Sequence, residues 1–129
     1  MKHIPIVDDS KLNLENFNPV YNFIRRTLSR SKKEVQIVLY TLQETADNQP
    51  LLADYEEAVA ILEEAILSSL RRADVSTRYS SKQVIVILME TSLDNGRQVA
   101  QRILEQYHEM YVNPNIQVTY DIVQMKVEK

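Results

Sequence analysis

A short polar stretch in the middle of the chain separates two segments of strand-like composition. Residues Ser80 to Gln83 (SSKQ) follow the segment VSTRY and precede the apolar run VIVILM. β-Branched and aromatic residues on both sides predict a hairpin, with strands over 75–79 and 84–89 and the polar stretch at its tip. Binding and catalytic side chains often lie on such tips, because rigid strands present them at the surface. The tip is therefore the first candidate site.

Composition excludes several kinds of site. The chain has no cysteine, which excludes disulfides and thiolate chemistry, and His3 and His108 lack a spacing typical of zinc ligands. The only glycine is Gly96, so glycine-rich loops that bind phosphates are not expected. The net charge of −3 gives no attraction to nucleic acid or anionic membranes. No apolar stretch approaches the roughly 18 residues of a membrane span, and the N-terminus has no signal-peptide pattern, so we expect a soluble chain with neither partner.

Hydrophobic periodicity predicts seven elements in the order α-β-α-β-β-α-β. They are a helix over 17–28, a central strand over 34–42 buried on both faces, a helix over 52–72 with Arg71 and Arg72 at its end, strands over 75–79 and 84–89, a helix from a cap at Thr91 or Ser92 to about residue 110, and a strand over 116–125. Gly96 lies inside the last helix, where glycine costs about 1 kcal/mol relative to alanine, so we expect close packing there.

Without its first helix, this order is the ferredoxin-like β-α-β-β-α-β motif, an antiparallel sheet with both crossover helices on one face. The first helix is expected to cover the other face. A chain of 129 residues has the size of one domain. We therefore expect an α/β (α+β) fold, with an N-terminal extension over 1–16 and a single domain over 17–129.

The segment Leu70 to Ile103, LRRADVSTRYSSKQVIVILMETSLDNGRQVAQRI, resembles the C-terminal half of GGDEF domains, the diguanylate cyclases that join two GTP molecules into cyclic di-GMP. The family pattern is Arg-x-x-Asp, five residues, Gly-Gly-Asp/Glu-Glu-Phe, an apolar strand, a turn, and a helix with Ala-x-Arg-Ile. The segment matches this pattern without a gap. The resemblance implies a cytoplasmic domain that works in bacterial signalling.

The sequence departs from the family at the signature itself, whose five positions are occupied by Ser80, Ser81, Lys82, Gln83 and Val84. Family cyclases use the acidic signature residues, with an aspartate of the first strand, to hold two magnesium ions. Magnesium requires hard anionic oxygens, but Lys82 supplies a cation, and the gapless match puts Leu39 to Thr41 at the first-strand acids. The resemblance therefore implies a degenerate member without cyclase activity, metal site or cofactor.

The residues of a second site of GGDEF domains are all present in this sequence. Arg71, Asp74 and Arg102 occupy the three positions of the product-binding inhibitory site of GGDEF domains. Guanidinium groups pair with phosphates and guanine acceptors, and a carboxylate accepts guanine N–H groups. The alternative is that these are ordinary solvated residues on helix flanks. Two functions therefore remain open: a cyclic di-GMP receptor, or a nucleotide-independent module for homodimerisation or for docking another signalling domain. An active nucleotide cyclase or hydrolase is disfavoured.

Overall fold

The computed structural model describes residues 34–45 and 50–125, which form one sheet and two helices. In chain order the elements are β1 (Val35–Glu44), α2 (Leu52–Ser69), β2 (Val75–Ser80), β3 (Gln83–Leu88), α3 (Leu93–Met110) and β4 (Ile116–Met125). The predicted order β-α-β-β-α-β is confirmed. The helix predicted over 17–28 and the boundary at residue 16 lie outside the described residues. Neither described helix is long and apolar enough to cross a membrane.

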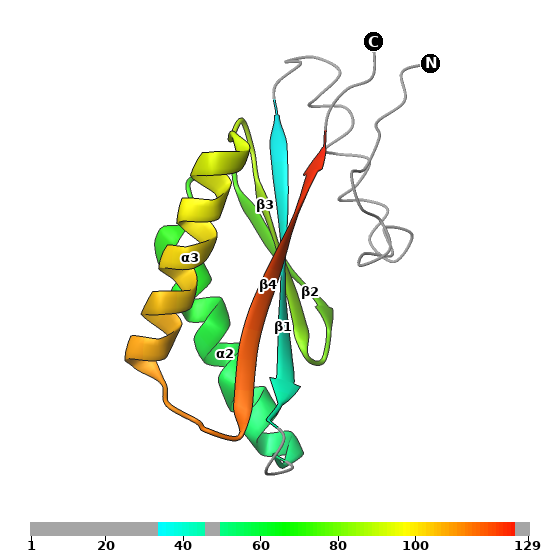
Figure 1. The fold of residues 1–129 in the computed structure, drawn as a ribbon, viewed down its shortest axis with the longest axis vertical. Coiled ribbons are helices and arrows are strands. Elements are labelled where there is room, and N and C mark those ends of the chain that lie inside the picture. The colour runs from blue at the N-terminus through cyan, green and yellow to red at the C-terminus, as the bar shows by residue number, and fades with distance from the viewer. Residues whose placement is uncertain (1–33, 46–49, 126–129) are drawn as a thin grey trace.

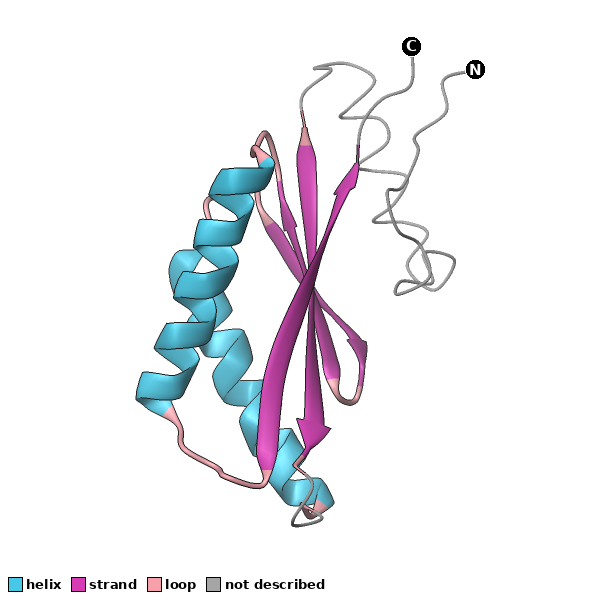
Figure 2. Cartoon of the chain, viewed as in Figure 1, coloured by secondary structure: helices cyan, strands magenta, loops and turns pink. Residues whose placement is uncertain are grey.

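The four strands form one sheet in the order β2-β3-β1-β4, and every neighbouring pair is antiparallel. Helix α2 connects β1 to β2, and α3 connects β3 to β4, so each connection passes over one intervening strand. Both helices lie on the same face of the sheet, as Figures 1 and 2 show. This is the ferredoxin-like arrangement predicted from the element order.

Strand β1 lies in the centre of the sheet and is buried on both faces, as its sequence predicts. Val38, Tyr40 and Leu42 belong to the core beneath the two helices. Ile37 and Leu39 alternate with them along the strand, point to the opposite face and are also buried. The Tyr40 hydroxyl donates a hydrogen bond of 2.8 Å to the Ala100 carbonyl and so fixes α3 against β1.

Gly96 permits close contact between α3 and β1. A Cβ atom at this position would lie 2.9 Å from Cγ of the buried Gln36 side chain, so the predicted close packing is confirmed. The Gln36 amide donates to the Thr91 carbonyl at 3.1 Å, immediately before α3 begins. The first turn of α3 is therefore held at a fixed distance from the start of β1.

The end of α2 differs from its prediction. The helix ends at Ser69, not at Arg72, because Leu70 is already extended with ψ 141°. The Asp74 carboxylate accepts the backbone N–H of Arg71 at 3.0 Å, and Asp74 N–H donates to the Arg71 carbonyl at 3.0 Å. These local bonds stabilise a turn in place of a further helical turn. Arg71 therefore lies in the α2–β2 loop and not on a helix flank.

The hairpin tip is shorter than predicted. Ser80 and Gln83 are the last paired residues of β2 and β3, so only Ser81 and Lys82 form the turn. The Ser80 hydroxyl accepts the Lys82 backbone N–H at 3.3 Å and closes the turn without glycine. Hydrophobic periodicity could not indicate that Ser80 and Gln83 belong to the strands, because both side chains are polar in a strand as well as in a turn.

Candidate functional site

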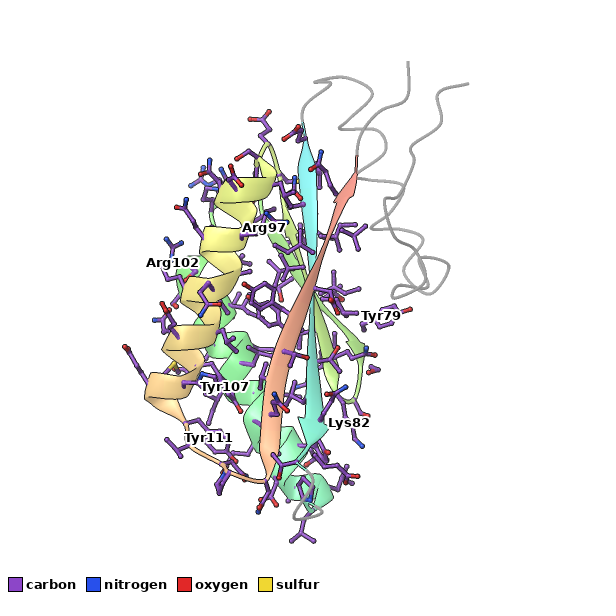
Figure 3. All side chains as sticks on the ribbon, in the orientation of Figure 1. Tyr79, Lys82, Arg97, Arg102, Tyr107 and Tyr111 are labelled. Carbon is purple, nitrogen blue, oxygen red and sulfur yellow. The ribbon has the colours of Figure 1, made fainter. Side chains whose placement is uncertain are left out.

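A pocket of about 150 Å³ opens between the end of α2, the end of β3 and the first turns of α3. Its lining residues are Ser69, Arg71, Asp74, Leu88, Glu90, Thr91, Asn95, Val99 and Arg102. The structure thus brings together Arg71 and Asp74 of the Arg-x-x-Asp motif and Arg102 of α3, which lie in two separate segments of the sequence match. Arg102 is labelled on the outer side of α3 in Figure 3.

An ion pair between Arg71 and Asp74 forms one wall of this pocket. Asp74 Oδ2 accepts from the Arg71 backbone N at 3.0 Å and from Arg71 Nε at 3.1 Å. Asp74 Oδ1 accepts from Arg71 Nη2 and from the Met89 backbone N, both at 3.0 Å. Only 1% of the Asp74 side chain is exposed. The carboxylate is thus fully used, and it ties the α2–β2 loop to the end of β3; we call these contacts the Arg71–Asp74 clasp.

Arg71 contributes only part of its guanidinium to the clasp. Nη2 also donates to the Met89 carbonyl and, at 2.7 Å, to Thr91 Oγ1, while Nη1 makes no hydrogen bond with the described residues. The side chain is 58% exposed. Its hydrogen bonds to Asp74 raise the pKa of Arg71 above the ordinary value. One edge of the guanidinium therefore holds the loop, and the Nη1 edge can donate to a ligand.

Two further charged residues line the pocket, Arg102 and Glu90. Both are exposed, and neither makes a hydrogen bond or ion pair within the described part of the chain. Glu90 follows β3 in a left-handed backbone conformation, with φ 48°. Sequence patterns gave no indication of Glu90, because a charged residue after a strand is usually a solvated loop residue.

The cap of α3 was expected at Thr91 or Ser92. Ser92 is the cap, because its side chain accepts from Asn95 N at 3.2 Å, and Thr91 lines the pocket.

The hairpin tip lies at the opposite end of the sheet (Figure 1). Gln83 is opposite Thr41 of β1 in the strand register, and its Nε2 lies 3.4 Å from Thr41 Oγ1. Gln83 Oε1 also accepts from Ser80 Oγ at 2.9 Å. The Lys82 ammonium lies 4.3 Å from the centre of the Tyr55 ring, a cation–π contact with α2. The polar side chains of the tip therefore bind one another and α2.

The strand positions matched to the first-strand acids carry no carboxylate. Leu39 and Tyr40 are buried, and Thr41 pairs with the tip. Within 34–45 and 50–125, no group of three or more histidine, cysteine, aspartate or glutamate side chains could hold a metal ion. The five residues from Ser80 to Val84 are thus a two-residue turn with the strand ends that it joins, about 17 Å along β3 from the pocket.

No protein-family model and no curated protein matches the chain. Several solved structures share its fold. A diguanylate cyclase protein from Thermotoga maritima matches with a TM-score of 0.65 and 11% identity, over 84% of this chain and 78% of its own. The active GGEEF domain of a diguanylate cyclase from Vibrio cholerae matches with a TM-score of 0.59 and 16% identity, over 75% of this chain and 65% of its own.

A third similar structure is the Pseudomonas aeruginosa diguanylate cyclase SiaD, solved in complex with its activator SiaC. It matches with a TM-score of 0.59 and 14% identity, over 81% of this chain but only 43% of its own. These similarities at low identity establish the fold. The mixed α/β architecture described above is that of GGDEF diguanylate cyclase domains.

Proposed function

We propose that this chain, which has the fold of GGDEF diguanylate cyclase domains, is a signalling domain that lacks cyclase activity. The observation that carries the proposal is the neutral pair of Thr41 and Gln83 at the hairpin tip. In the sequence match, these residues stand at first-strand and signature positions where family cyclases have magnesium-binding acids. A threonine hydroxyl and a glutamine amide lack the negative charge that magnesium requires.

The neighbouring Lys82 makes metal binding less favourable still. Its ammonium lies beside the Tyr55 ring at the tip, where it repels a divalent cation. Without magnesium, the charge that develops on the transferred phosphoryl group has no metal to neutralise it. The absence of acidic residues at these positions of two strands, with a lysine next to one of them, supports a domain that does not convert GTP.

The test is a turnover assay with GTP and magnesium on the purified chain. The active GGEEF domain from Vibrio cholerae, assayed under the same conditions, is the positive control. We expect product from the control and no cyclic di-GMP from this chain. Cyclic di-GMP above the background of a protein-free sample would refute the proposal.

We further propose that the domain is a cyclic di-GMP receptor that binds at the pocket of Arg71 and Arg102. The support is geometric: both guanidinium groups line one pocket, and each offers N–H donors that no described residue uses. Charge-assisted hydrogen bonds contribute about 1.5–3 kcal/mol each, so a few of them with base stacking could give micromolar affinity.

Calorimetric titration with cyclic di-GMP tests the proposal that the domain is a receptor. Arg102→Ala is the informative variant, because Arg102 makes no contact that the described fold needs, whereas Arg71 holds the clasp. Arg97→Ala is the matched control: Arg97 is an exposed arginine of α3 that lines a different pocket, about 140° around the helix. We expect Arg102→Ala to weaken binding at least tenfold and Arg97→Ala to leave it unchanged.

Absence of binding up to high micromolar ligand would refute the receptor. The nucleotide-independent alternative would then be favoured, in which the domain forms a homodimer or docks a signalling protein. SiaD, a protein of the same fold, was solved in complex with its activator. Sedimentation of the chain across a concentration series separates these two: self-association favours the homodimer, and a monomer favours a different partner.

A further inference from the structure

Two carboxylates line the pocket, and only one of them is available to a ligand. Asp74 accepts four N–H groups from Arg71 and Met89, and its side chain is 1% exposed. Glu90 is exposed and makes no hydrogen bond or ion pair with any residue that the structure describes. A ligand donor can therefore reach Glu90 without breaking existing contacts, whereas reaching Asp74 requires opening the clasp.

We infer that Glu90, and not Asp74, selects the ligand, by accepting the adjacent N1–H and N2–H donors of a guanine base. The inference depends on the proposed cyclic di-GMP receptor and assigns to Glu90 the role that the sequence match gives to Asp74. Asp74 is then a positioning residue that shapes the pocket wall.

The charges of the pocket favour a base edge over a bare phosphate. Arg71 and Arg102 contribute two positive charges, and Asp74 and Glu90 contribute two negative charges, so the lining is neutral overall. A phosphate would be repelled by the unpaired Glu90 carboxylate. Guanine has carbonyl and ring-nitrogen acceptors that suit an arginine fork, and N–H donors that suit a carboxylate. It therefore matches both kinds of charge at once.

The size of the pocket is consistent with one base. Its volume of about 150 Å³ is below the roughly 300 Å³ at which pockets for drug-sized ligands begin. The remainder of a cyclic dinucleotide would lie outside, where Arg102 and the Nη1 edge of Arg71 are exposed. The pocket would thus bind the base, and the two arginines would remain accessible to the phosphates.

The backbone on both sides of Glu90 is fixed by the clasp. Met89 N–H donates to Asp74, and the Met89 carbonyl and Thr91 hydroxyl accept from Arg71. Thr91 N–H also donates to the Glu34 carbonyl at 3.0 Å. Glu90 is held between these anchors with φ 48°, a conformation uncommon for a residue with a side chain. Its carboxylate therefore emerges from a preorganised loop, and its charge raises the pKa of the neighbouring Arg71.

Calorimetry with two ligands on the full chain tests the inference. Cyclic di-GMP presents the paired donors, and cyclic di-AMP lacks them. We expect wild type to prefer cyclic di-GMP, because adenine offers the Glu90 carboxylate only one N6–H donor, beside the N1 acceptor, in place of two adjacent donors. Glu90→Gln keeps the side-chain size but offers one acceptor and one donor, and it should weaken cyclic di-GMP binding at least tenfold without weakening cyclic di-AMP binding.

Two variants separate the carboxylate from the loop. Glu90→Gly accommodates φ 48° without a side chain, so it should lose cyclic di-GMP affinity as Glu90→Gln does. Glu109→Gln removes an exposed carboxylate from the last turn of α3, away from the pocket, and should change neither affinity. Each variant should still unfold cooperatively in urea, which shows that it folds, and unchanged cyclic di-AMP binding shows that the pocket is intact.

The outcomes distinguish this inference from the receptor on which it depends. If wild type does not bind cyclic di-GMP, the receptor and the inference both fall. If wild type binds and both Glu90 variants bind equally well, Glu90 is not the selecting group, although the receptor stands. Equal weakening of both ligands would likewise overturn base selection, because it would indicate a general effect on the pocket.

Discussion

Replacement of Asp74 by asparagine should destabilise the fold although it leaves the shape of the side chain unchanged. Asp74 Oδ2 accepts from the Arg71 backbone and from Nε, and Oδ1 accepts from Nη2 and from the Met89 backbone. An asparagine replaces one of these oxygens by an NH₂ group, which would face N–H donors. Whichever way the amide is oriented, one backbone bond and one guanidinium bond are lost.

The magnitude follows from these two lost bonds. A hydrogen bond to a charged group contributes about 1.5–3 kcal/mol, and a buried N–H left without an acceptor costs about 1–3 kcal/mol. The guanidinium contribution is discounted to at most about 1 kcal/mol, because the Arg71 side chain is 58% exposed and solvent screens its charge. We therefore expect Asp74→Asn to lower the free energy of unfolding by about 1–4 kcal/mol.

Urea unfolding followed by circular dichroism measures this loss through linear extrapolation. Glu109→Gln serves as the matched control and should stay within about 0.5 kcal/mol of wild type, as exposed substitutions usually do. Arg71→Gln and the double variant complete a mutant cycle, with an expected coupling of about 0.5–3 kcal/mol between Arg71 and Asp74. An Asp74→Asn loss below 0.5 kcal/mol, or additive effects, would refute a structural clasp.

Three further predictions concern the packing of β1 and α3. Gly96→Ala should lower the free energy of unfolding by about 1–3 kcal/mol in urea titrations, because the new Cβ would lie 2.9 Å from Gln36 Cγ. This loss should exceed the gain from the better helix propensity of alanine. Unchanged or increased stability would contradict the close contact. Tyr40→Phe should cost about 1 kcal/mol in the same assay, because it removes the hydrogen bond to the Ala100 carbonyl, and a neutral result would show that this bond contributes nothing. Burial raises the pKa of Tyr107 from 10.0 to about 12. Between these values the folded state keeps a proton that the unfolded state releases, so the free energy of unfolding should be full below pH 10 and fall between about pH 10 and 12. Tyr107→Phe should make this decrease with pH less steep.

The elements of the fold were predictable because their signals are local. β-Branched residues from Val35 to Leu42 indicated a strand buried on both faces, and the apolar period of α3 indicated an amphipathic helix. Even the packing role of Gly96 followed from the cost of glycine inside a helix. Boundaries were less predictable, since the end of α2 is set by hydrogen bonds between Arg71 and Asp74, and periodicity does not contain that information.

The sequence pointed to three residues that line one pocket, but not to the contacts that they make. The match to a family pattern pointed to Arg71, Asp74 and Arg102, and the structure places them around one pocket. It could not indicate that the Asp74 carboxylate is used within the protein, because this depends on Met89, fifteen residues later, meeting it across the β2–β3 pair. Glu90, which we infer to select the ligand, gave no sequence signal for the same reason: its exposure and φ 48° depend on the loop around it.

The proposed receptor without cyclase activity requires that the two ends of the sheet can change independently, and their contacts are separate. The tip is closed by short-range contacts of Ser80, Lys82 and Gln83. The pocket is held by the clasp about 17 Å away, where β3 ends. Substitutions more than about 10 Å apart without shared partners usually have additive effects on stability. Substitutions at the tip are therefore expected to leave the clasp unchanged, as the proposed combination of a ligand pocket with a tip that lacks acidic residues requires.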